Sequence, residues 1–283
     1  LAGVFAVGDI AALLWQRGSA WTTPRREALV TALADKVVMV TGVAKGCGKV
    51  LAEAFAADRA KVVGCDIDVD AGRATAAAVR AAGGEMTFVE ADVADDAAVQ
   101  ELVAMTVRTY GGLDCAVNNA GTEATGLIAQ SDDDVFDRLI AVNLKGLLSC
   151  LRHEITVMRA RGGGSIVNMS SVTSDITAVP ANGLYAATKG GVNALTKAAA
   201  IEVAKDNISV NSLAFAAIDI PGDMVWRFLD SQGIPAEQLV SMFPIGRMGR
   251  PEELVAAVRY LCSDDARYMT GTMLVLDGGY TAQ

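Results

Sequence analysis

Short apolar runs recur along the chain from residue 36 onward, and stretches with helical periodicity separate most of them. Hydrophobic and β-branched residues fill the runs almost without interruption, which is typical of strands buried on both faces of a sheet. The predicted strands cover residues 36–41, 61–66, 86–92, 113–119, 165–170, 208–214 and 273–277. The predicted helices cover residues 47–58, 70–82, 95–110, 132–159, 184–204 and 251–263. This alternation predicts a single doubly wound α/β domain with a seven-stranded parallel sheet.

The first 34 residues do not follow this alternation. Residues 1–15 are apolar, but Asp9 interrupts them and they are shorter than the roughly 18–20 residues that a membrane-spanning helix needs. No basic segment precedes them, so neither a secretory signal nor a membrane span is expected. Thr23 and Pro24 are suited to begin a short helix. We expect a helical extension over residues 1–34, with a membrane-surface anchor or a weakly ordered tail as alternatives, and one domain over residues 35–283.

Composition narrows the function classes. The chain has 283 residues, of which 52% are hydrophobic and 20% charged, as in ordinary soluble globular proteins. Its 24 basic and 33 acidic residues leave a net charge of −9, which opposes binding to nucleic acid. The five cysteines show no C-x-x-C spacing, which indicates reduced thiols in a cytoplasmic protein. A single histidine, His153, excludes multi-histidine zinc sites, and we expect no bound metal.

A glycine-rich loop, TGVAKGCG, joins the first predicted strand to the first predicted helix. Three glycines at this point allow a tight turn, close approach of a pyrophosphate and close packing of helix on strand, while the helix N-terminus faces the anion. The second predicted strand ends at Asp66, where a carboxylate can accept hydrogen bonds from an adenosine ribose. The pattern predicts a dinucleotide site. Its residues at this end are Gly42, Lys45, Gly46, Cys47, Gly48, Asp66 and the following Ile67.

Asp66 also bears on the choice of cofactor. A carboxylate here repels the 2′-phosphate of NADP and suits the ribose hydroxyls of NAD. Lys45, inside the loop, is a cation that would attract the same phosphate, unless it is simply a solvated lysine in a turn. We therefore predict NAD as the cofactor, with NADP as the alternative.

Three further segments accompany the T-G-x-x-x-G-x-G spacing: NNAG at 118–121, SIVNMSS at 165–171 and YAATK at 185–189. Together with Asn143 in VNLKG and the ending DGGY, they resemble the short-chain dehydrogenase/reductase family in the family's own order. The resemblance covers about residues 35–283. It implies a Rossmann-like fold, a homo-oligomer that is usually a tetramer and otherwise a dimer, and NAD(P)-dependent interconversion of small alcohols and ketones.

The resemblance also assigns further cofactor contacts. It implies that Asp92 and Val93 contact the adenine, that Asn119, Ala120 and Gly121 lie against the adenosine ribose, and that the backbone of Ile218 meets the nicotinamide carboxamide. This sequence departs from the family after the sixth predicted strand. Phe215-Ala216 stands where Pro-Gly is usual, and Ile220 replaces a threonine that contacts the cofactor. One lost hydrogen bond is worth roughly 0.5–1.5 kcal/mol, so we expect weaker cofactor binding rather than its loss.

The catalytic residues implied are Asn143, Ser171, Tyr185 and Lys189, and the last two also belong to the predicted cofactor site. A tyrosine with a pKa near its reference value of about 10 is a poor base at neutral pH. Because Tyr185 and Lys189 are four residues apart on a predicted helix, the ammonium is expected to lower the pKa of the phenol. Ser171 would hydrogen-bond the substrate oxygen, and Asn143 would bend its helix around a water that links Lys189 to solvent.

Two neighbouring serines leave alternatives. Ser170 competes with Ser171, but side chains alternate along a strand, so it is expected on the opposite face. Ser174 stands where a glycine often follows the catalytic serine in this family, so the sequence departs from the family pattern in this loop as well.

Residues 219–249 correspond to the place of a mobile lid in this family, and they are rich in apolar side chains. The predicted substrate pocket comprises Val179, Leu184, Met224, Trp226 and Phe228, with Met242 and Phe243 as further apolar candidates. Packing within the lid or contact with another subunit is the alternative interpretation. No cluster of Arg or Lys in the lid calls for a charged substrate, so we expect an uncharged alicyclic or aromatic secondary alcohol or ketone.

Three other functions are alternatives to this one. A 3-oxoacyl thioester reductase would use NADPH, which Lys45 permits and which Asp66 and the net charge oppose. A protein that binds or senses NAD without turnover would have no need of the Ser, Tyr and Lys set. A hydrolase is the least favoured alternative, because its catalysis would depend on His153 and this sequence has no G-x-S-x-G motif.

Overall fold

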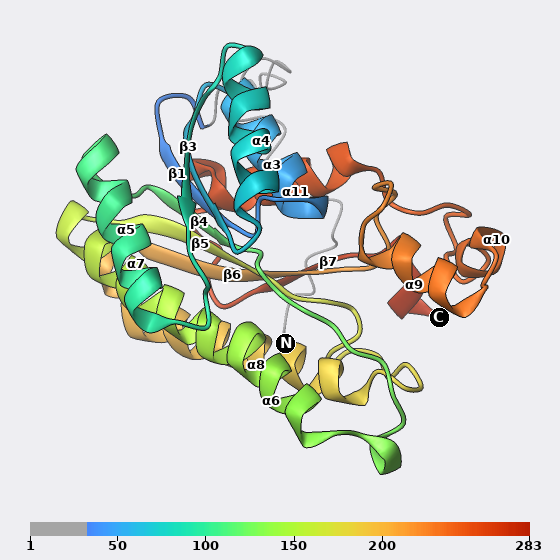
Figure 1. Cartoon of the computed structure of the whole chain (residues 1–283). Coiled ribbons are helices and arrows are strands. Elements are labelled where there is room, and N and C mark those ends of the chain that lie inside the picture. The colour runs from blue at the N-terminus through green and yellow to red at the C-terminus, as the bar shows by residue number, and fades with distance from the viewer. Residues whose placement is uncertain (1–32) are drawn as a thin grey trace, which may run out of the picture. The chain divides into compact units, whose positions relative to one another are not determined.

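A computed structural model of the chain describes residues 33–283 (Figure 1). The helical extension expected over residues 1–34 lies almost entirely outside the described residues.

The predicted parallel sheet is confirmed. It has seven strands in the order β3-β2-β1-β4-β5-β6-β7, and every neighbouring pair is parallel. The strands are β1 (Val37–Thr41), β2 (Lys61–Asp66), β3 (Glu85–Glu90), β4 (Cys115–Asn118), β5 (Gly164–Met169), β6 (Ile208–Phe215) and β7 (Met273–Leu276). The side chains of β1, β4 and β5 are buried throughout, as expected for central strands covered on both faces.

Two layers of helices cover the sheet (Figure 1). The first layer contains α3 (Gly46–Ala57), α4 (Val69–Ala81) and α11 (Pro251–Cys262). The second contains α5 (Asp96–Tyr110), α7 (Leu147–Arg161) and α8 (Gly183–Val203). Each layer has its own apolar core: Phe55 and Leu254 lie in the first, and Leu102 and Met158 in the second, all of them fully buried.

The strand order reverses at β1, which lies between β2 and β4. In open α/β sheets, ligands bind outside the carboxyl ends of the strands at such a switch point. The loops that follow β1 and β4 meet there, so this edge of the sheet is where a site is expected.

The helix predicted over residues 132–159 is observed as two helices with a distorted turn between them. α6 (Asp133–Ile140) and α7 are joined by the π-helical segment Ala141–Gly146. A π turn adds a residue to the helical repeat and often marks a functional position. Here it contains Asn143, so the helical repeat changes at the residue where the sequence predicts a bend.

The segment expected to form a lid contains two short helices, α9 (Met224–Gln232) and α10 (Ala236–Val240), between β6 and α11. Short 3₁₀ turns lie at Ile128–Gln130, Ala204–Asp206, Asp264–Ala266 and Tyr280–Ala282. In Figure 1, α9 and α10 stand at one end of the domain, beside the C-terminus.

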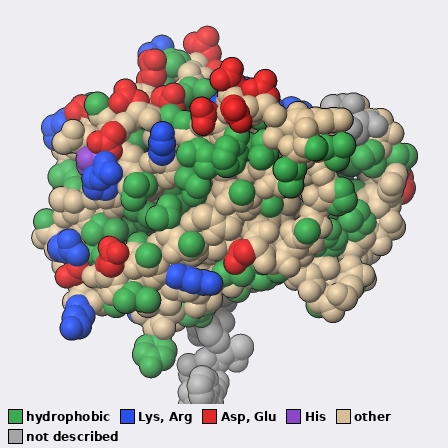
Figure 2. Space-filling model, turned by 90° about the horizontal axis from the view of Figure 1, so that it is seen from below, with side chains coloured by type: hydrophobic (Ala, Val, Ile, Leu, Met, Phe, Trp, Pro, Cys, Tyr) green, Lys and Arg blue, Asp and Glu red, His purple; other side chains and the backbone are tan. Residues whose placement is uncertain are grey.

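The surface seen from below in Figure 2 mixes exposed hydrophobic side chains with acidic and basic ones. Helices of the second layer carry some of the most exposed hydrophobic residues, including Leu148 on α7 and Ile201 on α8, which are 45% and 81% exposed. In the described part of the chain, no helix is long and apolar enough to span a membrane. All five cysteines are unpaired.

Candidate active site

The glycine-rich loop after β1 is fastened to the end of β4. The Thr41 hydroxyl accepts hydrogen bonds from the backbone N–H groups of Asn119 (3.0 Å) and Ala120 (2.9 Å). In return, the Asn119 side-chain amide donates to the carbonyl oxygens of Thr41 (2.9 Å) and Gly42 (3.1 Å). A Cβ atom at Gly48 would collide with the Gly42 carbonyl oxygen, so only glycine allows the first turn of α3 to approach the loop this closely.

Asp66 ends β2 next to this loop. Its carboxylate accepts hydrogen bonds from the backbone N–H of Ala44 in the loop (2.9 Å) and of Asp68 (3.0 Å). The acid predicted to select the cofactor therefore also shapes the loop. Ile67 beside it is 71% exposed, and Lys45 is exposed at the start of α3.

These features fit a dinucleotide. Lys45 is the N-cap of α3 but provides no side-chain cap, so the N–H groups of the first helical turn face the loop without a capping side chain. Gly42 and Gly48 let the loop and the first turn of α3 pack closely on each other, with the Asn119 side chain beside both glycines. One group opposes an anion here: the carboxylate of Asp223, from the lid, accepts a hydrogen bond from the Cys47 thiol at 3.6 Å.

The other predicted cofactor contacts lie along the same edge of the sheet. Asp92 is exposed after β3, and its carboxylate accepts the Ala94 N–H at 2.9 Å. Val93 is buried, and Ile218 is buried in a parallel bridge to Gly249. Ile220, which replaces the usual threonine, is also buried, so this position has an apolar contact in place of a hydroxyl.

Tyr185 and Lys189 lie one turn apart on α8. The Lys189 Nζ lies 5.7 Å from the centre of the Tyr185 ring and donates a 2.7 Å hydrogen bond to the carbonyl oxygen of Met169, at the end of β5. Ser171 is the second residue after that strand. Its hydroxyl accepts the Thr173 N–H at 3.0 Å, and it lies close enough to the Tyr185 phenol to lower the pKa of that phenol. The three predicted residues are thus brought together.

The two candidate serines point to different neighbours. Ser170 is fully buried, and its hydroxyl donates a 3.4 Å hydrogen bond to the backbone carbonyl of Lys189. Ser171 is the one beside Tyr185. The downstream Ser174 accepts a hydrogen bond from the Asn193 amide at 3.4 Å, which ties the loop to α8.

Asn143 connects three segments around the site. Its side-chain amide donates to the Thr122 carbonyl oxygen (2.8 Å) and to the Thr188 hydroxyl (3.0 Å), and its oxygen accepts the Thr122 N–H (2.9 Å). The asparagine thereby fixes the chain that follows Gly121 and holds it against α8.

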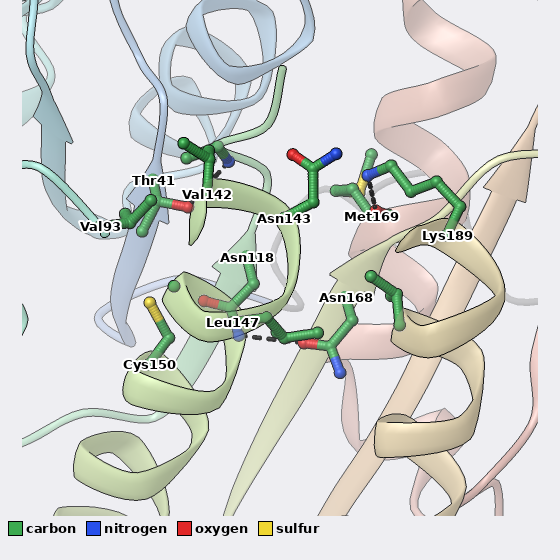
Figure 3. A pocket seen from close by; sticks show the side chains of 13 residues that line it. Thr41, Val93, Asn118, Val142, Asn143, Leu147, Cys150, Asn168, Met169 and Lys189 are labelled. Carbon is green, nitrogen blue, oxygen red and sulfur yellow. Dashed lines mark hydrogen bonds between the residues drawn. The ribbon is translucent and has the colours of Figure 1, made fainter. Parts of the chain in front are cut away.

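A small cavity lies on the inner side of these residues (Figure 3). Its volume is about 10 Å³, close to the size of one water molecule. Lys189 and Asn143 line it together with Asn118 and Asn168, whose side-chain amides are hydrogen-bonded at 3.0 Å. The cavity, with apolar side chains among its other neighbours, lies beside the place where the sequence predicted a water relay.

The pKa of Tyr185 is raised, opposite to the direction predicted from the sequence. Burial is the largest cause, and the negative charge of Glu123 adds to it, while the hydrogen bond from Ser171 works in the opposite direction. Burial also lowers the pKa of Lys189 to about 8. Tyr185 is partly buried and Lys189 is buried, so each is pushed toward its neutral form.

Sequence reasoning missed Glu123. The carboxylate of Glu123 is half-buried. The preceding residue, Thr122, is held through its backbone by two hydrogen bonds to Asn143, which fixes where Glu123 begins. Burial raises its pKa to about 7, and the Arg227 guanidinium of the lid opposes that rise while Asp223 adds to it. The sequence feature that could have indicated Glu123 as a residue of the site is its position two residues after the NNAG motif.

The predicted substrate residues are less closely connected to the site. Val179, Leu184 and Met224 are partly exposed, and none of the five lines the cavity of Figure 3. The Trp226 indole N–H donates to Asp219 at 3.1 Å, within the lid. Of the two further apolar candidates, Met242 is 42% exposed.

Phe243, the other apolar candidate, packs inside the protein. It is buried, it packs edge-to-face on Tyr280 with ring centres 5.8 Å apart, and it lines a surface hollow beside α10. This packing agrees with the alternative that the sequence left open, and a role of Phe243 in substrate binding stays a prediction.

Comparison with known proteins independently supports the resemblance to a family of dehydrogenases and reductases. A family model described as Enoyl-(Acyl carrier protein) reductase matches residues 42–281. The chain is 37% identical over 252 residues to a 2,5-dichloro-2,5-cyclohexadiene-1,4-diol dehydrogenase of Sphingobium indicum, covering 88% of this chain and 98% of that protein. It is 34% identical over 252 residues to a cyclohexanol dehydrogenase of Acinetobacter sp., covering 88% and 96%.

A solved structure of a short-chain type dehydrogenase/reductase from Mycobacterium marinum superposes with a TM-score of 0.83 at 30% identity, covering 91% of this chain and all of that one. Its fold and the sequence matches agree with the motifs and with the site described above. The chain belongs to the short-chain dehydrogenase/reductase family and is an oxidoreductase acting on CH–OH groups.

Proposed function

We propose that the protein is an NAD-dependent dehydrogenase that interconverts an uncharged alicyclic or aromatic secondary alcohol and its ketone. The observation that carries this proposal is the grouping of Tyr185, Ser171 and Lys189 at the carboxyl edge of the sheet, next to the loop that Asp66 shapes. The nicotinamide, when bound, supplies the hydride acceptor or donor for this reaction. Gly42, Gly46 and Gly48 with the N-terminus of α3 would hold the phosphates of the cofactor, and Asn119 would keep the loop in shape.

Tyr185 is the acid and base of the proposed reaction. As the phenolate, Tyr185 takes the hydroxyl proton when an alcohol is oxidised, and as the phenol it donates a proton to the substrate oxygen when a ketone is reduced. The raised pKa of Tyr185 keeps the phenol protonated, which suits ketone reduction in particular. The Ser171 hydroxyl hydrogen-bonds the same substrate oxygen and stabilises the charge that develops on it. Lys189 and Asn143 hold the surrounding backbone in place through Met169 and Thr122.

Asp66 supports NAD over NADP. Its carboxylate stands at the end of β2, where it would accept hydrogen bonds from the adenosine ribose and repel a 2′-phosphate. Its two bonds to backbone N–H groups fix its orientation.

The substrate class rests on the apolar lid and on the relatives, whose names specify a cyclohexadienediol and cyclohexanol. The alternative of a 3-oxoacyl thioester reductase has one observation in its favour, the description of the matching family model. Asp66 argues against the NADPH that it would use. A cofactor-binding protein without turnover is opposed by the complete set of Ser171, Tyr185 and Lys189.

We also propose that the protein forms a homo-oligomer. The exposed hydrophobic side chains of Leu148 and Ile201, on two neighbouring helices, support a contact between copies. Light scattering of the full chain measures its mass. An Ile201→Asp variant is expected to have a lower mass than the wild type, and a monomeric wild type would contradict this proposal.

The experiment that tests the proposed reaction follows absorbance at the nicotinamide band with a panel of substrates. The panel contains cyclic, aromatic and aliphatic secondary alcohols and their ketones, together with a 3-oxoacyl thioester, each with NAD(H) and NADP(H). Turnover of a cyclic or aromatic alcohol with NAD supports the proposal. Turnover of the thioester alone with NADPH replaces it by the reductase alternative, and binding of NADH without any turnover replaces it by the cofactor-binding alternative.

A further inference from the structure

The residue that begins the lid helix lies against the cofactor loop. Asp223 is the N-cap of α9, but its side chain forms no capping hydrogen bond. Its carboxylate is directed to the loop instead, where Oδ2 accepts a hydrogen bond from the Cys47 thiol at 3.6 Å. Asp223 therefore connects two segments that are 176 residues apart in the sequence.

The approach of Asp223 to the loop depends on a missing side chain. A Cβ atom at Gly46, the first residue of α3, would lie only 2.9 Å from the Asp223 Cγ. Gly46 has a φ of +58°, which also favours glycine. The carboxylate consequently closes directly on the backbone at the start of α3, the part of the helix that attracts anions.

The negative charge of Asp223 acts on its surroundings. It adds to the effect of burial in raising the pKa of the Cys47 thiol, which therefore stays protonated as the donor of the hydrogen bond. It also contributes to the raised pKa of Glu123 and of Tyr185. The charge of this one lid residue thus acts from the glycine loop to the catalytic tyrosine.

We propose that Asp223 sets the affinity of the loop for its dinucleotide, by competing with the cofactor's phosphates for the N-terminus of α3. This inference rests on the proposed function, because it takes the loop of Gly42, Gly46 and Gly48 to hold the phosphates. A carboxylate and a phosphate repel each other, so a cofactor bound at this loop would separate Asp223 from Cys47 and move the start of α9 away from the loop. The position of the lid and the occupancy of the cofactor site are then linked, and the same repulsion promotes cofactor release.

The test measures binding of ADP-ribose, which carries the pyrophosphate but no nicotinamide, by calorimetric titration of the full chain. Asp223→Asn removes the charge and keeps the shape of the side chain. Because the native side chain does not cap α9, this substitution should leave the helix intact. Asp230→Asn is the matched control, since it removes the same charge from an exposed position near the other end of α9.

We expect Asp223→Asn to bind ADP-ribose at least about tenfold more tightly than the wild type at low salt, and Asp230→Asn to stay within about twofold of it. The difference should shrink at high salt, where exposed charges are screened. Equal or weaker binding by Asp223→Asn, with the wild type binding normally, would overturn the role of Asp223 alone. Absence of binding by all three proteins would overturn the dinucleotide site itself, and with it the proposed function.

Discussion

The Lys189 ammonium lies 5.7 Å from the centre of the Tyr185 ring, one helical turn away, and it is hydrogen-bonded to the backbone of Met169. Its partner is thus the end of β5, the strand that leads to Ser171. Lys189 therefore positions the serine strand and the tyrosine helix relative to each other, in addition to any effect of its charge. Burial lowers the pKa of Lys189 to about 8, so this charge is partly lost in mildly alkaline solution.

Replacing Tyr185 by Phe should remove most turnover and leave NADH binding unchanged. A positioned acid or base contributes about 10²–10⁴-fold to a rate, and the variant loses only the phenol oxygen. Turnover is measured by nicotinamide absorbance and binding by titration with NADH. Tyr268→Phe is the matched control because its side chain is fully exposed, and it should behave as the wild type. Normal turnover by Tyr185→Phe would contradict the assigned role.

Replacing Glu123 by Gln should shift the pH profile of alcohol oxidation to lower pH. Oxidation needs the phenolate of Tyr185, so the rate rises as pH passes the pKa of that phenol. The negative charge of Glu123 raises this pKa, and its removal lowers it, so the rise begins at a lower pH. The profile of kcat/KM measures the shift. Glu202→Gln, at an exposed position on the same helix as Tyr185, should leave the profile in place, and an upward shift in Glu123→Gln would refute the effect.

Replacing Asp66 by Asn should narrow the difference in binding affinity between NADH and NADPH. The substitution removes the repulsion of a 2′-phosphate and weakens acceptance of the ribose hydroxyls, so NADPH binding strengthens while NADH binding weakens. Dissociation constants for both nucleotides give the ratio. Asp68→Asn, two residues away, provides a control for loss of charge. The assignment fails if the wild type already binds NADPH more tightly than NADH.

Replacing Glu154 by Gln should flatten the dependence of stability on pH. This carboxyl group is fully buried on α7, and the Asn118 amide donates to its Oε2 at 3.1 Å. Within the described part of the chain, its Oε1 has no hydrogen-bond partner. Burial raises the pKa of Glu154 to about 8 from an ordinary value of 4.5.

A carboxyl group with a raised pKa stabilises the folded protein fully below pH 4.5, and this contribution is lost as pH rises through about 8. The wild type should therefore lose stability over this interval by at most about 1.4 kcal/mol per pH unit from this group. Chemical denaturation at pH 5, 6.5 and 8 measures the free energy of unfolding. Equal pH dependence of the wild type and Glu154→Gln would show that Glu154 is ionised in the folded state.

The sheet and its order of helices were predictable because apolar runs and helical periods are local properties of the sequence. The π turn at Asn143 was not, since one extra residue barely disturbs the apolar pattern of residues 132–159. The grouping of Ser171, Tyr185 and Lys189 followed from the family resemblance. The direction of the pKa shift at Tyr185 did not, because it depends on burial and on Glu123, which only the folded chain places beside the phenol.

The hydrogen bonds between Thr41 and Asn119 join residues that are 78 positions apart in the chain. A segment that stops before β4 contains β1, α3 and β2, yet lacks the amide that holds the carbonyl oxygens of Thr41 and Gly42. Without β4 paired to β1, the glycine loop therefore lacks these two hydrogen bonds. Nucleotide binding then reports on the assembly of the central sheet, and a bound nucleotide favours the completed sheet over every partly folded form.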